Sequence, residues 1–99
     1  MAYTILIADD EAEIRQLLRL YLEKDGYEVM EAENGVEAME ILRQREIHLI
    51  LLDIMMPQLD GYQVLRKLRQ ESNIPVIFLS AKGADEDKIL GLDLGADDY

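Results

Sequence analysis

Three aspartates directly follow two apolar segments of the chain. Asp9 and Asp10 come after the run 5–8, and Asp53 comes after the run 48–52. If these runs are neighbouring parallel strands, their carboxyl ends share one edge of a sheet and the carboxylates form one acidic pocket. Such carboxylates repel one another unless a proton or a cation intervenes, and Mg2+ is commonly held by carboxylates, waters and phosphate oxygens. The spacing predicts a divalent metal site in which Asp53 could attack a phosphoryl group.

Each of these residues also has an ordinary structural interpretation. Asp10 with Glu13 three residues later fits a capping box at the start of a helix, and for Asp10 alone the cap is the favoured interpretation. Asp53 could be a turn residue, and Ser80 could be a loop hydroxyl that bonds a nearby backbone group. His48 lacks the neighbours of a catalytic triad and receives no role. The joint placement of the aspartates is what favours a site.

The aspartates need a sheet to position them, and the apolar pattern predicts one. Near-continuous apolar runs at 5–8, 48–52 and 76–79 are typical of parallel strands that helices cover on both faces. The run 28–32 is more polar and alternates, which suits a strand at the edge of the sheet. These four runs are separated by segments with helical periodicity, so we expect an α/β fold.

Four helices are expected, which gives the order βαβαβαβα. The apolar residues of the first helix should face the sheet, and these are Ile14, Leu17, Leu18, Tyr21 and Leu22. Its polar residues are left for solvent, and these are Arg15, Gln16, Arg19 and Glu23. The other helices are expected at 35–45, at 61–70 with Asp60 as its cap, and at 85–94. Right-handed crossovers then give a doubly wound parallel sheet.

The composition is that of one soluble globular domain. Its 99 residues suffice for a single core, with 49% apolar and 31% charged residues. Cysteine is absent, which excludes disulfides and thiolate chemistry and fits a reducing cytoplasm. No segment approaches the ~20 apolar residues of a membrane span. The net charge of -11 repels nucleic acid and anionic lipid, so we expect a cytoplasmic chain that binds neither DNA nor membranes directly.

Four segments resemble the receiver-domain pattern of bacterial response regulators in order and spacing. They are LIADDE at 6–11, LDIMMP at 52–57, DG at 60–61 and PVIFLSA at 75–81. A set of this kind is far more specific than any one of its parts, and it covers the whole chain. By analogy with a chemotaxis member of the family, the resemblance implies a flavodoxin-like sheet of order 2-1-3-4-5. The segments DKILGL and GADDY near the end further resemble OmpR/PhoB-type regulators, whose receivers precede a winged-helix DNA-binding domain.

The resemblance implies a phosphoacceptor module that takes its phosphoryl group from a sensor histidine kinase. Carried over residue by residue, it makes Asp53 the phosphoacceptor and Asp10 a direct Mg2+ ligand. Asp9 would bind the Mg2+ through water, and the backbone carbonyl of Met55 would be a further ligand. Such a module catalyses only its own phosphorylation and dephosphorylation, and it switches a transcriptional output.

The remaining matches concern the switch and the loop after Asp53. Ser80 matches the hydroxyl that bonds the phosphoryl oxygen, and Tyr99 matches the aromatic switch residue of a fifth strand. Pro57 and Gly61 match positions that shape the loop and open the third helix. The family pattern continues past the aromatic to a lysine and a fifth helix. We therefore expect residues 1–99 to be one receiver domain truncated in its fifth strand, with no output domain.

Other functions remain open at this stage. A truncated receiver leaves the strand 76–79 uncovered, so we expect self-association, and a fragment that only self-associates is one alternative. A Mg2+-dependent phosphohydrolase with an aspartyl nucleophile is another, although it would normally have a second acid where Met55 stands. A flavin or nucleotide module would need a Gly- or Ser/Thr-rich phosphate loop, and the acidic 9–11 segment would repel it.

Overall fold

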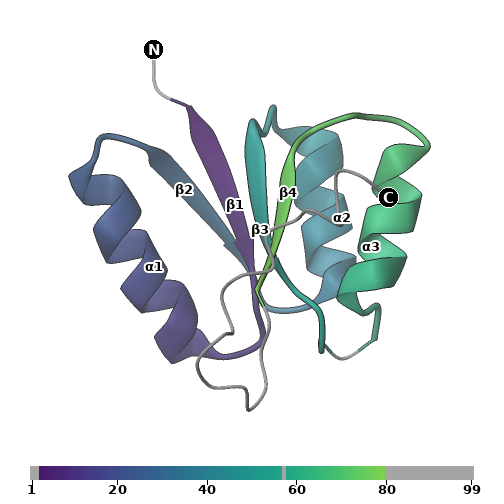
Figure 1. Cartoon of the computed structure of the whole chain (residues 1–99), viewed down its shortest axis with the longest axis horizontal. Helices are drawn as coiled ribbons and strands as arrows, with labels where there is room; N and C mark the ends of the chain where they lie inside the picture. The colour runs from purple at the N-terminus through teal and green to yellow at the C-terminus, as the bar shows by residue number, and fades with distance from the viewer. Residues whose placement is uncertain (1–2, 57, 80–99) are drawn as a thin grey trace.

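Four parallel strands form the centre of the structure, a computed structural model that describes residues 3–56 and 58–79 (Figure 1). The strands are β1 (Thr4–Ala8), β2 (Glu28–Ala32), β3 (Leu49–Asp53) and β4 (Val76–Leu79). Their order is β2-β1-β3-β4, and every neighbouring pair is parallel. This confirms the predicted α/β sheet and places the polar run 28–32 at an edge, as expected. The predicted fifth strand lies outside the described residues.

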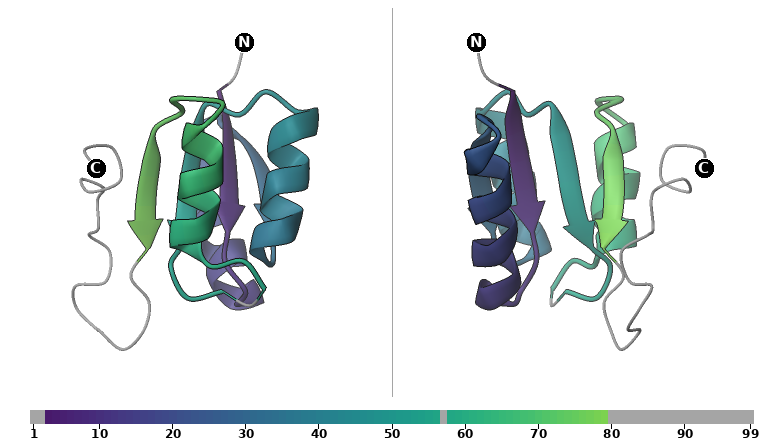
Figure 2. Two further views of the ribbon diagram at one scale, coloured as in Figure 1. Left: turned by 90° about the vertical axis from the view of Figure 1, so that its right-hand side faces the viewer. Right: turned by 60° about the vertical axis from the view of Figure 1, so that its left-hand side comes forward.

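Within the described residues, three helices cover the two faces of this sheet. Helix α1 (Ala12–Lys24) lies on one face, whereas α2 (Gly35–Gln44) and α3 (Gly61–Arg69) lie together on the other (Figures 1 and 2). The helix expected at 85–94 falls outside the described part of the chain. None of the described helices has the length and apolar composition that crossing a bilayer requires.

The core divides into two clusters because side chains alternate across each strand. The larger cluster lies under α2 and α3, and its fully buried members include Leu6, Ile50, Leu52, Val64 and Val76. The smaller cluster lies under α1 and consists of Ile5, Ile7, Val29 and Leu51, with partly buried residues such as Leu18 and Leu22 against it. Both faces of β1 and β3 are therefore buried, which explains their near-continuous apolar sequences.

Helices α2 and α3 begin where polar side chains cap them. The side chain of Asn34 accepts a hydrogen bond from the Glu37 N–H at 2.8 Å. Asp60 and Gln63 form a reciprocal capping box, with both hydrogen bonds at 2.9 Å, so the predicted cap of α3 is confirmed. Each helix ends one residue before its predicted end, because the last residue predicted for it is its C-cap. This residue is Arg45 in α2 and Gln70 in α3.

Helix α1 packs Leu18 and Leu22 against the sheet as predicted, but it is rotated so that other predicted residues of this face do not. Leu17 and Tyr21 were expected to face the sheet, but they are 51% and 63% exposed. Arg15 and Arg19 were expected in solvent, but they lie against β2, where both pair with Glu31. Glu31 lies on the α1 side of β2 with its side chain 23% exposed, and a partly buried carboxylate is stabilised by cationic partners. The rotation brings two guanidinium groups over the sheet and leaves two large apolar residues in solvent.

Candidate functional site

The three predicted aspartates meet at the carboxyl edge of the sheet. Asp9 and Asp10 follow β1, and Asp53 is the last residue of β3. The strands are adjacent and parallel, with Ala8 paired to Leu52, so the residues after them emerge side by side at the lower end of the sheet in Figure 1. One carboxylate oxygen from each aspartate lies within 4.8 Å of the others. The structure therefore brings together the acidic pocket that the strand pattern predicts.

Burial and mutual repulsion make this pocket suitable for a cation. Asp9 is 5% exposed and Asp53 is 3% exposed, whereas Asp10 is open to solvent. Burial raises the pKa of the Asp9 carboxyl, the hydrogen bond from the Glu11 N–H opposes this, and the charge of Asp10 raises the pKa further. A bound divalent cation would neutralise the negative charges of the carboxylates and so favour their ionised forms. The donors are all oxygens, which suits Mg2+ rather than a softer metal.

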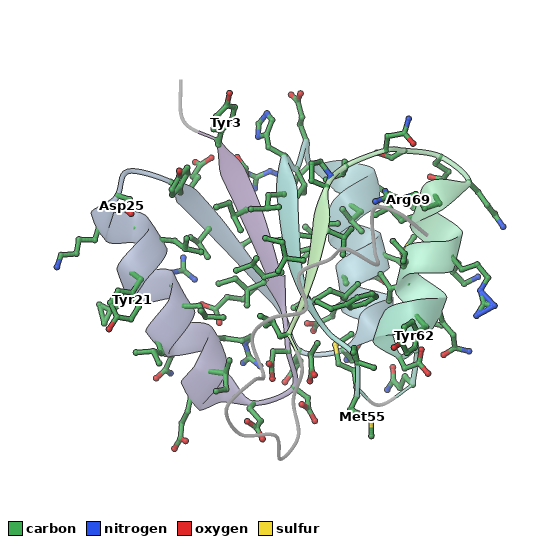
Figure 3. All side chains as sticks on the ribbon, viewed as in Figure 1. Tyr3, Tyr21, Asp25, Met55, Tyr62 and Arg69 are labelled. Carbon is green, nitrogen blue, oxygen red and sulfur yellow. The ribbon has the colours of Figure 1, made fainter. Side chains whose placement is uncertain are left out.

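The loop after β3 holds the Asp53 carboxylate by its backbone. The Met55 N–H donates to Asp53 Oδ1 at 3.2 Å, and the Gly61 N–H donates to the Ile54 carbonyl at 3.0 Å. Met56 is buried in the core and anchors the loop, while the Met55 side chain is 58% exposed and extends into solvent (Figure 3). The Met55 carbonyl as a Mg2+ ligand stays a prediction.

Gly61 lets α3 begin directly against the end of β3. A Cβ atom at this position would lie 2.5 Å from the Asp53 carbonyl oxygen and 2.8 Å from the Ile54 Cα. Neither neighbour can give way, because both are backbone atoms of the segment that carries Asp53. The predicted need for a small residue at Gly61 therefore follows from this close approach.

Asp10 is not the cap of α1, so the favoured interpretation of Asp10 alone was wrong. The N-cap residue is Glu11, and its side chain makes no capping hydrogen bond. Asp9 instead accepts a hydrogen bond from the Glu11 N–H at 2.8 Å through Oδ1. The helix begins at Ala12, so Asp10 lies one residue too early to serve its N-terminus. Its exposed carboxylate is left facing the pocket.

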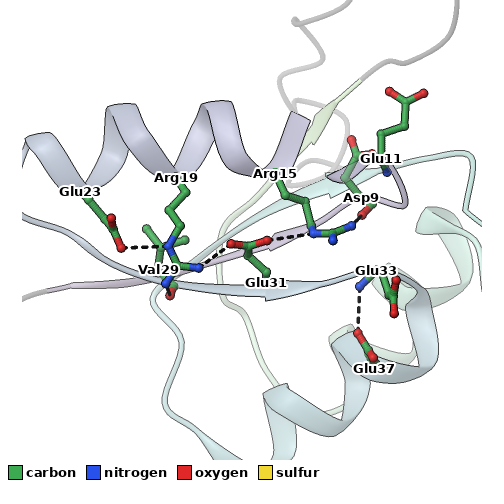
Figure 4. Close-up of polar contacts among 9 residues, drawn as sticks. All are labelled: Asp9, Glu11, Arg15, Arg19, Glu23, Val29, Glu31, Glu33 and Glu37. Carbon is green, nitrogen blue, oxygen red and sulfur yellow. Dashed lines mark hydrogen bonds and ion pairs between the residues drawn. The ribbon is translucent and has the colours of Figure 1, made fainter. Parts of the chain in front are cut away.

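Arg15 connects the site to β2, a role that the sequence pattern did not indicate. Its Nη1 donates to the Asp9 carbonyl oxygen at 2.8 Å, and its Nε donates to Glu31 Oε1 at 2.9 Å (Figure 4). Arg19 lies one turn further along α1 and bonds the same Glu31 carboxylate, together with Glu23 and the Val29 carbonyl. The one signal in the sequence was the i, i+4 spacing of the two arginines on a helix that packs beside an acidic strand residue.

Replacing Glu31 by Gln should lower stability at neutral pH by on the order of 1 kcal/mol, because two arginines lose their shared carboxylate. Burial raises the pKa of Glu31, but hydrogen bonds from Arg19 and Arg15 outweigh it, so the pKa is lowered overall. Because the pKa of Glu31 is lower in the folded chain than in the unfolded chain, where it is about 4.5, the charged carboxylate stabilises the fold above that pH. This stabilisation is lost as the pH falls through the pKa of Glu31 in the folded chain.

Urea unfolding at several pH values would measure this effect. The difference between the wild-type chain and E31Q should shrink as the pH drops below about 4.5. The matched control is Glu40→Gln on the exposed side of α2. If E40Q lowers stability as much as E31Q does, or if the effect of E31Q does not change with pH, the stabilising role of the Glu31 ion pairs is contradicted.

The other predicted positions lie elsewhere or outside the described residues. Ser80, Tyr99 and Pro57 belong to the latter group, so their predicted roles stay predictions. His48 lies at the opposite end of the sheet from the aspartates, where its Nδ1 accepts a hydrogen bond from the Thr4 N–H at 2.9 Å. This backbone contact gives His48 a structural role at the start of β1 and β3.

The chain matches the response regulator receiver domain model over residues 5–99. It belongs to the response regulator receiver family. This receiver is 54% identical to response regulator GtcR of Aneurinibacillus migulanus and 48% identical to transcriptional regulatory protein SrrA of Staphylococcus aureus, in both cases over all 99 residues. It spans 41% of each of these relatives, so it corresponds to about two-fifths of their length.

A solved structure shows the same fold with a metal in place. Response regulator TrrA of Thermotoga maritima, in complex with Mg2+-BeF, superposes on the receiver with a TM-score of 0.76. The two are 38% identical, and the match covers 82% of this chain and 71% of TrrA. The flavodoxin-like architecture of the receiver is thus shown by sequence and by structure.

Proposed function

We propose that this receiver accepts a phosphoryl group from a sensor histidine kinase on Asp53, with Mg2+ as cofactor, and thereby switches a transcriptional output in the cytoplasm. The observation that carries the proposal is the meeting of Asp9, Asp10 and Asp53 at the carboxyl edge of the sheet, two of them buried. The Mg2+-BeF complex of TrrA supports the choice of cofactor, and the name of SrrA supports a transcriptional output.

The proposed step forms an acyl phosphate. A deprotonated Asp53 oxygen attacks the phosphorus of a phosphohistidine, the new P–O bond forms as the P–N bond breaks, and the electron pair returns to the imidazole nitrogen. Asp9 and Asp10 would hold Mg2+, which when bound neutralises charge on the phosphoryl oxygens. The Met55 N–H holds one oxygen of Asp53, and this contact orients the nucleophile.

Further residues complete the proposed site. The Met55 carbonyl would be a Mg2+ ligand, Ser80 would bond a phosphoryl oxygen, and Tyr99 would respond to that contact as the switch residue. The receiver is a signalling module that acts only on its own phosphoryl group. A phosphohydrolase is less well supported, because the position two residues after Asp53 carries a thioether that cannot act as an acid.

Incubating the chain with a small acyl phosphate and Mg2+ tests the proposal. We expect uptake of a phosphoryl group that hydroxylamine removes, as it does from acyl phosphates, and we expect chelation of the metal to prevent uptake. The same preparation should not hydrolyse an aryl phosphate through repeated turnovers. Uptake that is equal without metal would contradict the proposal, and sustained hydrolysis would favour the phosphohydrolase.

We also propose that the 99-residue chain self-associates through β4. This strand is an outer strand of the sheet that the described residues form, and its Ile77 and Leu79 are only partly buried on the α1 side. Apolar outer strands pair with other chains through their free N–H and C=O groups. Light scattering should show a mass above that of a monomer, and Ile77→Lys should reduce it. A monodisperse monomer at high concentration would contradict this proposal.

A further inference from the structure

We propose that Arg15 is a positioning residue of the cation site, whose guanidinium fixes the backbone of Asp9 and thereby the direction of the Asp9 carboxylate. The inference rests on the proposed function, since it assumes that Asp9 and its neighbours hold Mg2+. It adds a residue from the middle of α1 that makes no contact with the cation itself.

The backbone of Asp9 is held on both sides. Its N–H donates to the Ala32 carbonyl of β2 at 3.1 Å, and its carbonyl oxygen accepts from Arg15 Nη1 at 2.8 Å. Arg15 is itself anchored to β2 through Glu31, and its side chain is only 15% exposed. The Asp9 side chain is held in turn by the Glu11 N–H at 2.8 Å. Without Arg15, the Asp9 carbonyl oxygen would lose its hydrogen bond to the guanidinium, and only the N–H side of the Asp9 backbone would still be held.

Charge and position predict opposite results for the loss of Arg15. The guanidinium is a positive charge beside a cation site, so its removal should strengthen cation binding if charge alone matters. If Arg15 positions Asp9, its removal should weaken binding, as loss of residues that orient metal ligands commonly does. The direction of the change therefore separates the two effects.

Arg19 supplies a matched control. It lies one turn further along α1, bonds the same Glu31 carboxylate and carries the same charge. Its other contacts are with Glu23 and the Val29 carbonyl, so it does not touch Asp9. An alanine at either position removes one guanidinium from the Glu31 cluster, but only the alanine at Arg15 releases the Asp9 backbone.

Mg2+ and Ca2+ respond differently to a misplaced ligand. Mg2+ demands near-ideal octahedral geometry, whereas Ca2+ accepts six to eight oxygens in flexible arrangements. Asp9 would hold a water ligand of the cation, so a displaced Asp9 should misplace that water and weaken Mg2+ binding more than Ca2+ binding. A pure change of charge would strengthen the binding of both cations by similar factors, and unfolding would abolish the binding of both.

Calorimetric titration of the chain with each cation tests the inference. We expect Arg15→Ala to lower the Mg2+ affinity by at least about tenfold, with a smaller loss for Ca2+. Arg19→Ala should stay within about twofold of the wild type, since it leaves the Asp9 carbonyl contact intact. Arg15→Lys should recover part of the Mg2+ affinity, because an ammonium can still donate to the Asp9 carbonyl.

The outcomes separate this inference from the proposed function. If the wild-type chain binds no Mg2+, the proposed function fails and the inference fails with it. If the wild type binds Mg2+ but R15A and R19A bind it with equal affinity, only the positioning role is overturned. The same holds if R15A binds both cations more tightly than the wild type does. If R15A does not fold, Arg15→Met and Arg19→Met are compared, because methionine keeps an unbranched side chain but cannot donate to the Asp9 carbonyl. Equal Mg2+ affinities of these two variants would overturn the positioning role.

Discussion

Replacing Asp53 by Asn should abolish phosphoryl uptake from a small acyl phosphate. The amide is uncharged and its nitrogen lone pair is delocalised, so it cannot act as the nucleophile that the acyl phosphate requires. We expect the rate of uptake to fall at least about 100-fold, which corresponds to a barrier higher by about 2.7 kcal/mol. Radiolabel or intact-mass measurements with Mg2+ present would follow the reaction.

The D53N variant should remain folded, so the loss is not a loss of structure. The amide is nearly isosteric with the carboxylate, and its oxygen can still accept the hydrogen bond from the Met55 N–H. The variant E40Q is a suitable control, since it removes one negative charge from an exposed position of α2 that is not part of the acidic pocket. Uptake by D53N at the wild-type rate, on another aspartate of the pocket, would contradict the assignment.

Replacing Asp10 by Ala should remove most of the stabilisation that Mg2+ confers. A cation that binds only the folded chain stabilises it by about 2.7 kcal/mol at 100 times its dissociation constant. Asp10 contributes one of three carboxylate groups that lie within 4.8 Å of one another, so its loss weakens that binding. Thermal melts with and without Mg2+ would show a rise in Tm for the wild type and little rise for the variant.

A helix cap gives the matched control for this experiment. Asn34→Ala removes a real cap of α2, which should cost about 1 kcal/mol with or without Mg2+. Asp10 is exposed and precedes the N-cap, and its charge repels the Asp9 carboxylate, so D10A should be neutral or slightly stabilising without metal. A metal-independent loss in D10A as large as that in N34A would contradict a metal-binding role for Asp10.

The strands and the acidic pocket could be predicted because both follow from short, local patterns. The runs 28–32 and 76–79 match β2 and β4 residue for residue, since branched and alternating apolar residues mark a strand without knowledge of its partners. Predicting the pocket required only one further inference, namely that adjacent parallel strands end at the same edge of a sheet. Asp53 was expected just beyond its strand, and it is the last residue within it.

The rotation of α1 could not be predicted in the same way. Arg15, Arg19 and Glu31 read as solvent-exposed charges when each is considered alone, and their pairing depends on how the helix packs across β2. The role of Asp10 depended on where α1 begins, and a helix start is uncertain by more than the one residue that separates Asp10 from the N-cap. The need for a small residue at Gly61 came from the family resemblance, but the sequence could not show that the Asp53 carbonyl oxygen and the Ile54 Cα impose it.

The position of the phosphoryl group is the most direct test of the account. Borohydride reduces an aspartyl phosphate to homoserine, so the phosphorylated chain can be reduced, digested and mapped by peptide mass spectrometry. We expect homoserine at position 53, in amounts that depend on Mg2+ during phosphorylation. Homoserine at position 9 or 10, or a phosphorylated chain that yields no homoserine, would contradict the proposal that Asp53 is the phosphoacceptor.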